Sequence, residues 1–323
     1  RKSFNNQYGL PLELLNMPRH TKYGFFEIGM NHSGEIKRLV KVLQPQTAII
    51  LNVENVHLGN FKSLKEIALA KSEIFTSTKS IENLIINRNS NFYKLLYILF
   101  KKSKISTCLD IGKVKSSKVY LKKETNISNI IKYQVILPDA SKLDFTLRKN
   151  QKNLIFNALA IITCFYMLGL NLKLINQFKN VPFTEGRGEI LKSKYMGNKL
   201  EVHDHSYNAS PVSMRDTIDI FNKFKNRHLV YVIGDMNELG KKSEKFHIDL
   251  IRYLIQIKAK KVIFVGAKLF SLRKRYNMLQ FEYYENIDSV ISNAEKIFNR
   301  NSKVFLKGSN SINLRKLSNH LIS

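Results

Sequence analysis

Short, almost wholly apolar runs alternate with longer segments of helical spacing in the first half of the chain. The apolar runs at 23–28, 47–53 and 83–87 have the length and composition of buried strands. Apolar residues recur every three or four positions over 35–43 and over 64–75, which predicts amphipathic helices. Strands and helices that alternate with short connections predict a parallel sheet with crossover helices.

The pattern changes within 114–148, where short alternating runs replace the longer helices. The runs at 119–121, 133–137 and 143–147 predict an antiparallel subsheet on the edge of the first domain. Residues 154–172 follow without a charge and are about as long as a bilayer requires. Polar residues interrupt this stretch, so we expect a helix buried between soluble layers and no stable membrane insertion.

A second alternating unit occupies the rest of the chain. Its predicted strands are 200–203, 228–233, 261–265, 281–284 and 303–306, and its predicted helices are 211–224, 243–257, 267–275, 287–298 and 311–321. Ser210 and Pro211 supply an N-cap and a first-turn proline for the first of these helices. We expect a smaller, Rossmann-like, doubly wound domain.

The turn-rich segment 182–189 is the best candidate for a hinge. We therefore assign residues 1–185 to the first domain and 186–323 to the second. Residues 5–11 are expected to form an extended opening. The chain begins with Arg1 instead of methionine, and no leader pattern follows, so we expect its natural start to lie upstream.

Composition excludes a disordered chain and a disulfide framework. The 323 residues are 44% hydrophobic, and Cys108 and Cys164 have no metal-site spacing, which favours a reducing compartment.

A net charge of +28 raises the alternative of a basic module that binds nucleic acid without catalysis and with steep salt dependence. The lysines are spread over the whole chain, so we expect no nucleic-acid partner. The most basic run, 93–104, is interpreted as a solvated helix face.

Lys71 lies at the centre of the apolar face of the helix predicted at 64–75. Ser63 and Glu66 have the spacing of a capping box that starts this helix. The residues three, four or seven positions from Lys71 on this face are apolar: Leu64, Ile67, Ala68, Ile74 and Phe75. A desolvated lysine has a lowered pKa, and its neutral amine can act as a nucleophile, form a Schiff base or capture carbon dioxide as a carbamate. The alternative is a stem that crosses the apolar face and an ammonium that stays in water.

Polar residues follow the predicted strands of the first domain at the edge where parallel sheets bind ligands. The strands at 23–28 and 47–53 place Glu27 and His57 there, and this pair predicts a shared Mg²⁺ site. A carbamate on Lys71 would add an anion that orients the metal or a phosphate. The structural alternatives are a helix-capping glutamate and a hydrogen-bonded surface histidine.

In the second half, Asp204 ends a predicted strand and Arg187 lies between two glycines of the hinge. An acidic residue at a strand end can accept hydrogen bonds from ribose hydroxyls, and an exposed arginine suits a phosphate. A turn-forming aspartate is the alternative for Asp204. Polar loops also follow strands at 234–240 and 307–309. No Walker loop, GxGxxG, HExxH or local nucleophile motif is present, so the residues predict a two-domain α/β protein with an anion and metal site.

A series of short motifs resembles one family in its order along the chain. The motifs are Asn5-Asn6-x-x-Gly9-Leu10-Pro11-Leu12, Phe26-Glu27-Ile28-Gly29-Met30-Asn31-His32-x-Gly34-Glu35-Ile36, Asn52-Val53-x-x-Val56-His57-Leu58, Ile67-Ala68-x-Ala70-Lys71-x-Glu73-Ile74, Gly186-Arg187-Gly188, Asp204-x-Ser206-Tyr207-Asn208-Ala209-x-Pro211-x-Ser213-Met214, Gly234-Asp235-Met236-x-Glu238-Leu239-Gly240 and Lys307-Gly308-Ser309. Together they resemble the Mur ligase family over nearly the whole chain. The motifs at 204–214 and 234–240 are the specific ones, because related ligases for other amino acids differ there.

The resemblance implies an ATP- and Mg²⁺-dependent ligase of peptidoglycan precursor synthesis. In the implied reaction, ATP phosphorylates the terminal carboxylate of UDP-N-acetylmuramoyl-tripeptide, and the amine of D-alanyl-D-alanine displaces the phosphate. It also implies a central ligase domain, incomplete here, before the Rossmann-like domain, and a cytoplasmic enzyme that we expect to be a monomer. A ligase with another acceptor, similar to folylpolyglutamate synthase, is the alternative within this superfamily.

Site residues follow from the resemblance by position. Glu27 and His57 match magnesium ligands, and Lys71 matches a lysine carried as a carbamate. Arg187 and Asp204 match contacts to the nucleotide phosphate and ribose, and Asn157 matches an asparagine near the adenine. The substrate-side candidates are Asn5, Asn6, Asn208 and Ser309.

The chain departs from the family pattern in several places. The nucleotide-binding loop and the uridine-binding domain would lie upstream of Arg1, and Leu154, Gly59 and Ser210 replace an asparagine, an acidic residue and an asparagine, respectively. Without a loop whose backbone N–H groups hold phosphates, residues 1–323 alone are expected to bind ATP weakly and not to ligate. Release of phosphate by this piece that depends on ATP and tripeptide would contradict that expectation.

Overall fold

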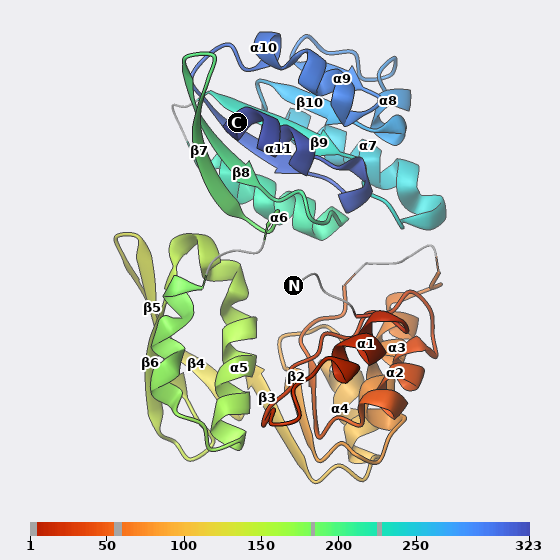
Figure 1. Ribbon diagram of the computed structural model, residues 1–323, viewed down its shortest axis with the longest axis vertical. Helices are drawn as coiled ribbons and strands as arrows, with labels where there is room; N and C mark the ends of the chain where they lie inside the picture. Colours follow the sequence, from red (N-terminus) through yellow and green to blue (C-terminus); the bar gives the residue numbers. More distant parts are fainter. Residues whose placement is uncertain (1–4, 55–59, 182–184, 225–227) are drawn as a thin grey trace. The chain divides into compact units, whose positions relative to one another are not determined.

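The computed structural model divides into two compact units (Figure 1). Unit 1 is Arg1–Glu54 with Asn60–Val181, and unit 2 is Asn55–Gly59 with Pro182–Ser323. The structure describes residues 5–54, 60–181, 185–224 and 228–323. Each unit has its own six-stranded sheet.

The sheet of unit 1 is parallel at one end and antiparallel at the other. Its strands are β1 (Thr47–Ile50), β2 (Asn83–Asn87), β3 (Thr107–Gly112), β4 (Val119–Ile127), β5 (Ile130–Ile136) and β6 (Lys142–Arg148). They lie side by side in this order, with parallel pairing from β1 to β4 and antiparallel pairing from β4 to β6. This confirms a mostly parallel sheet with an antiparallel subsheet.

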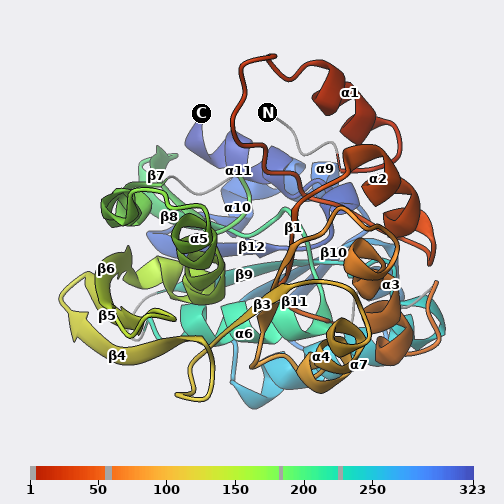
Figure 2. The ribbon, with the colours of Figure 1, turned by 90° about the horizontal axis from the view of Figure 1, so that it is seen from below.

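Helices pack on both faces of this sheet. α3 (Leu64–Thr76), α4 (Tyr93–Lys101) and α5 (Ile155–Met167) contact its strands, whereas α2 (Glu35–Leu43) packs on α3 and α1 (Gly9–Leu15) packs on α2. Side chains alternate along a strand, so Leu84 and Ile86 of β2 join the core under α3 and α4, whereas Ile85 joins the core under α5. Figures 1 and 2 show α3 and α4 side by side.

The uncharged segment forms α5, whose inner face is buried as expected, whereas Asn157 and Ile161 on its other face are exposed. Leu159 and Ile162 have no exposed surface. In the part of the chain that the structure describes, no helix has both the length and the apolar character that crossing a bilayer demands.

Two predictions for the start of unit 1 are wrong. Residues 23–28 form no strand, and Tyr23 and Phe25 are 48% and 65% exposed. An apolar run becomes a strand only where a neighbouring backbone completes its hydrogen bonds, and the described sheet holds no such neighbour for this run. The opening is also not fully extended, because residues 9–15 form α1, at whose start the N–H of Gly9 donates to the side-chain oxygen of Asn6.

Unit 2 is doubly wound, as predicted. Its strands are β7 (Glu189–Tyr195), β8 (Asn198–Asp204), β9 (Leu229–Gly234), β10 (Val262–Val265), β11 (Phe281–Tyr284) and β12 (Ser302–Lys307), in the order β11-β10-β9-β12-β8-β7. Only β7 pairs antiparallel within this described sheet. The sequence did not predict β7, because its alternate residues are at most half-buried and it lacks an apolar run.

The helices of unit 2 cover both faces of its sheet (Figure 1). They are α6 (Pro211–Asn222), α7 (Ser243–Gln256), α8 (Ala267–Ser271), α9 (Ile287–Ser292), α10 (Ala294–Ile297) and α11 (Arg315–Ile322). Ser210 caps α6 by accepting from the N–H of Ser213, which confirms the predicted start. The helix predicted at 287–298 is interrupted at Asn293, whose side chain donates to the carbonyl of Ser289.

Candidate functional site

Helix α3 places Lys71, which is half-buried, among apolar neighbours. The hydroxyl of Ser63 accepts from the N–H of Glu66, so the helix starts where the sequence predicted. Ile67 and Ala68 have no exposed surface, and Phe75 is 2% exposed. Burial lowers the pKa of Lys71 below its ordinary value, as predicted, because the low-dielectric surroundings disfavour the ammonium.

Two carboxylates oppose this effect. The charges of Glu27 and Glu54 raise the pKa of Lys71, although burial remains the larger cause. Both carboxylates therefore lie near the amine of Lys71, since charge effects on a pKa fall off with distance. The charge of Glu27 thus acts on the Lys71 amine, although Glu27 lies outside a strand and the predicted strand end was wrong. A metal site shared by Glu27 and Lys71 stays a prediction.

Glu54 was missed as a candidate from sequence. It directly follows the predicted strand 47–53. Polar residues after parallel strands lie at the edge where ligands bind, and this reasoning, which selected Glu27 and His57, applies equally to Glu54. His57 lies outside the described residues, and its metal-binding role stays a prediction.

Glu73, two positions after Lys71, anchors α3 to the start of α2. Its carboxylate accepts from the backbone N–H groups of Gly34 and Lys37, at 2.7 and 3.0 Å, and from the hydroxyl of Ser33 at 3.0 Å. A carboxylate at a helix N-terminus satisfies unpaired N–H groups and interacts favourably with the helix dipole. The segment between Glu27 and α2 is thereby held against the helix that carries Lys71.

The charged side chains that act on Lys71 are of the type that binds a hard divalent cation. Across residues 5–54, 60–181, 185–224 and 228–323, no group of three or more His, Cys, Asp or Glu side chains is arranged to hold a metal. Glu27 and Glu54 supply two carboxylates, and carbon dioxide captured by the Lys71 amine, with loss of a proton, would supply a third anionic oxygen group. Oxygen ligands of this kind suit Mg²⁺.

The other predicted residues of unit 1 occupy different surroundings. Asn157 is exposed on α5. The carbonyl of Asn5 accepts from the N–H of Gly29 at 2.9 Å, which places Asn5 beside the Glu27 segment. The side-chain oxygen of Asn6 accepts from the N–H groups of Tyr8 and Gly9, so this oxygen serves local structure.

In unit 2, the loop with Arg187 is bonded to the loop that follows β8. The carbonyl of Gly186 accepts from the N–H of Tyr207 at 3.0 Å, and the N–H of Gly188 donates to the carbonyl of Asp204 at 2.7 Å. Gly186 has φ +67°, and a Cβ there would lie 2.9 Å from the Tyr207 nitrogen, so only glycine fits. Arg187 is exposed, with its guanidinium carbon 3.9 Å from the centre of the Tyr207 ring.

Asp204 is fully buried and already has partners for both carboxylate oxygens. One oxygen accepts from the guanidinium of Arg315 at 2.7 Å, and the other accepts from the N–H of Ser206 at 2.9 Å. Arg315 also pairs with Glu189. Asp204 therefore holds the loop beside Arg187 in place, and its contact with a ribose stays a prediction.

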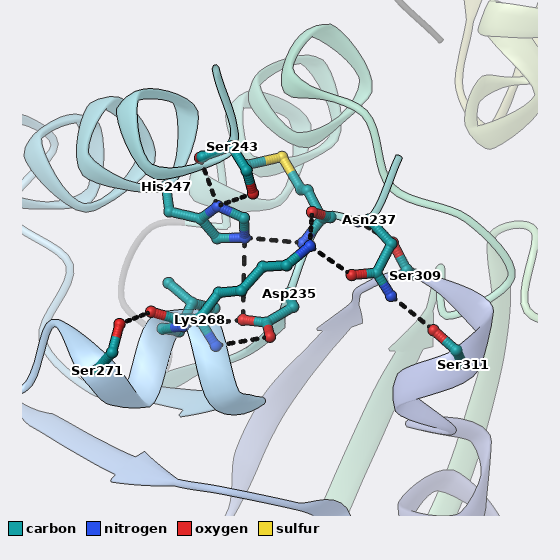
Figure 3. A network of polar contacts seen from close by, with 10 residues as sticks. Asp235, Asn237, Ser243, His247, Lys268, Ser271, Ser309 and Ser311 are labelled. Atoms are coloured by element: carbon teal, nitrogen blue, oxygen red, sulfur yellow. Dashed lines mark hydrogen bonds and ion pairs between the residues drawn. The ribbon is translucent and has the colours of Figure 1, made fainter. Parts of the chain in front are cut away.

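A buried polar network organises the loop after β9 (Figure 3). Asp235 accepts from the backbone N–H groups of Lys268 and Leu269, at 2.9 Å each. The Nε2 atom of His247 accepts from the N–H of Met236, and its Nδ1 donates to the carbonyl of Ser243. Burial lowers the pKa of His247, in keeping with a neutral ring that accepts at one nitrogen and donates at the other.

This network extends to Ser309, a predicted substrate-side residue. The ammonium of Lys268 donates to the side-chain oxygen of Asn237 at 2.7 Å, and the N–H of Asn237 donates to the hydroxyl of Ser309 at 2.8 Å (Figure 3). Asn208, the remaining predicted residue, is exposed, and its side-chain oxygen accepts from the N–H of Ala209.

Two glycines bring the ends of β9 and β12 into close contact. A Cβ on Gly308 would lie 2.7 Å from the Cα of Gly234, and a Cβ on Gly234 would lie 3.0 Å from the Cα of Gly308. The N–H of Ser309 also donates to the carbonyl of Asp235 at 2.9 Å. The loops that carry Asp235 and Ser309 are therefore adjacent at the carboxyl edge of the sheet.

Two family models match the chain, one in each half. The model for the Mur ligase middle domain matches residues 1–165, and the model for the Mur ligase glutamate ligase domain matches residues 186–310. A chain with these two α/β units is a ligase of the Mur type, and this one belongs to the Mur ligase family.

The most similar relatives belong to one branch of that family. The UDP-N-acetylmuramoyl-tripeptide--D-alanyl-D-alanine ligase of Rickettsia prowazekii is 30% identical over 323 residues, which cover 98% of this chain and 70% of the relative. A crystal structure of MurF from Acinetobacter baumannii matches with a TM-score of 0.82 and 25% identity, over 99% of this chain and 69% of the other. MurF ligase from Thermotoga maritima in complex with ADP has the same fold, with a TM-score of 0.73 and 21% identity, over 99% of this chain and 72% of the other.

Proposed function

We propose that the chain is the larger part of a ligase that joins D-alanyl-D-alanine to UDP-N-acetylmuramoyl-tripeptide with ATP. The observation that carries this proposal is the match to the D-alanyl-D-alanine ligase of Rickettsia prowazekii over 98% of the chain. The half-buried Lys71, whose pKa is lowered by burial and raised by the charges of Glu27 and Glu54, supports a site for anionic substrates and a divalent cation. We place the reaction in peptidoglycan precursor synthesis in the cytoplasm.

The proposed reaction couples phosphate transfer to amide formation. The terminal carboxylate of the tripeptide attacks the γ-phosphorus of ATP, which releases ADP and leaves an acyl phosphate. The amine of D-alanyl-D-alanine then attacks the acyl carbon, and the tetrahedral intermediate collapses with loss of phosphate and a proton. Charge builds up on phosphoryl oxygens in the first step, where cationic groups stabilise it.

Residues of both units have assigned roles in this proposal. Glu27, His57 and the Lys71 carbamate would hold Mg²⁺, which when bound neutralises charge on phosphoryl oxygens. The guanidinium of Arg187 contacts a nucleotide phosphate, Asp204 lies by the ribose and Asn157 by the adenine. The substrate-side residues are Asn5, Asn6, Asn208 and Ser309.

A glutamate ligase similar to folylpolyglutamate synthase is the second candidate, because the model for the second half is described as a glutamate ligase domain. The test measures phosphate release by the full-length gene product with ATP and UDP-N-acetylmuramoyl-tripeptide. Our proposal expects release with D-alanyl-D-alanine and little with glutamate or a diamino acid. Turnover with glutamate but not with the dipeptide would contradict it.

Replacement of Tyr207 with alanine is expected to raise the KM for ATP about two- to fivefold, with little change in kcat. The ring supports the Arg187 guanidinium, and such a stacking contact is worth about 0.5–1 kcal/mol at an exposed site. Tyr207→Phe keeps the ring and is expected to match the wild type. An unchanged KM for ATP in the alanine variant would show that Arg187 needs no such support.

A further inference from the structure

Lys307, the last residue of β12, is a buried ammonium that lacks a counter-charge. Lys307 is 5% exposed, and its Nζ donates to the carbonyl of Asn208 at 2.8 Å. An ammonium has three donors. Within the described ranges the structure records no carboxylate paired with it.

Two partly buried cations at this sheet do have carboxylate partners. Lys303, on the same strand as Lys307, pairs with Glu201, and Arg315 pairs with Asp204 and Glu189. An unpaired buried charge is costly, because the low dielectric removes hydration without replacing it. Burial accordingly lowers the pKa of Lys307 to about 8, so most of the lysine is still charged at neutral pH.

The histidine near Lys307 does not supply the missing charge. Burial, and to a lesser extent the charge of Lys307, lowers the pKa of His205 to about 3. The ring is therefore neutral at the pH at which the ammonium is charged. An anion that reached Lys307 would gain a charge-assisted hydrogen bond without having to displace an existing carboxylate.

Lys307 lies where ligands bind in sheets of this kind. It ends a parallel strand, and ligands of open α/β sheets bind outside the carboxyl ends of the strands. Its bond to Asn208 places it against the loop after β8, and Gly308 next to it contacts Gly234 at the end of β9. The loops that follow β8, β9 and β12 thus meet beside the ammonium of Lys307.

We propose that Lys307 binds the terminal carboxylate of the acceptor, a D-amino-acid dipeptide, at the carboxyl edge of the unit 2 sheet. The proposal rests on the proposed function, which requires an acceptor with a free amine and a carboxylate. With one donor used by Asn208, Lys307 has two left, which match the two oxygens of a carboxylate.

The test compares two acceptors in the full-length gene product: D-alanyl-D-alanine and D-alanyl-D-alaninamide, which lacks the carboxylate. The wild type is expected to show a KM about ten- to hundredfold lower for the acid, the range of a hydrogen bond to a charged group. In Lys307→Met the two KM values are expected to become nearly equal. Lys307→Gln, which keeps a donor for the carbonyl of Asn208, is expected to lose the preference as well.

Lys303→Met is the matched control, because Lys303 lies on the same strand but pairs with Glu201. It is expected to retain the wild-type preference for the acid. If Lys307→Gln also retains the preference, or weakens both acceptors equally, Lys307 is only structural and the proposal is wrong. A rise in the KM for ATP without loss of the acid preference overturns it too, because the anion is then a phosphate. Absence of any turnover with dipeptide in the wild type would instead contradict the proposed function.

Discussion

Replacement of Lys71 with alanine is expected to lower kcat of the full-length ligase at least about a hundredfold, the scale seen when one preorganised electrostatic contact is removed. In our proposal the Lys71 amine captures carbon dioxide, and the variant would therefore leave Glu27 and Glu54 without the third anionic group of the proposed site. Phosphate release with saturating substrates measures the effect.

Chemical rescue separates this role from a structural one. Short carboxylic acids such as acetate are expected to restore part of the activity of Lys71→Ala, because they supply the missing carboxylate. Lys65→Ala on the exposed face of α3 is the control and is expected to behave as wild type. Unchanged turnover in Lys71→Ala would end the carbamate hypothesis.

Replacement of Arg315 with alanine is expected to lower the free energy of unfolding of unit 2 by about 3–5 kcal/mol. Loss of one partner leaves the other charge of a buried pair uncompensated, and Asp204 is fully buried. Chemical denaturation of the whole chain, followed by circular dichroism, measures the change.

The neighbouring Lys316→Ala provides a matched comparison. Lys316 pairs with Asp288 at the surface, where their side chains are 53% and 66% exposed, and such pairs contribute less than about 1 kcal/mol. If the free energy of unfolding falls by a similar amount in the Arg315 and Lys316 variants, the burial of Asp204 does not determine how strongly its ion pair stabilises unit 2.

The sequence predicted those elements whose signals are local. Strand β2 and the start of α3 follow from an apolar run and a serine cap, and both are confirmed. The apolar neighbours of Lys71 follow from spacing along a single helix, but the same spacing also allowed an ammonium that stays in water, and only the structure shows that burial lowers its pKa.

Features that depend on distant residues were not predictable in the same way. An apolar run such as 23–28 becomes a strand only if another strand pairs with it, and this run has no such partner among the described residues. The ion pair of Asp204 with Arg315 joins residues 111 positions apart, so no local pattern indicates it. Whether Glu27 and His57 share a metal depends on residues that the structure does not describe, so that part of the site stays a prediction.

The contact between Gly234 and Gly308 limits how an enzyme of this architecture can evolve a new acceptor. Any larger residue at either position would force the two strand ends apart, so neither position can gain a side chain while the loops that carry Asp235 and Ser309 stay adjacent. A change of acceptor is therefore expected to arise from substitutions and insertions in the loops that follow the strands, while both glycines stay unchanged.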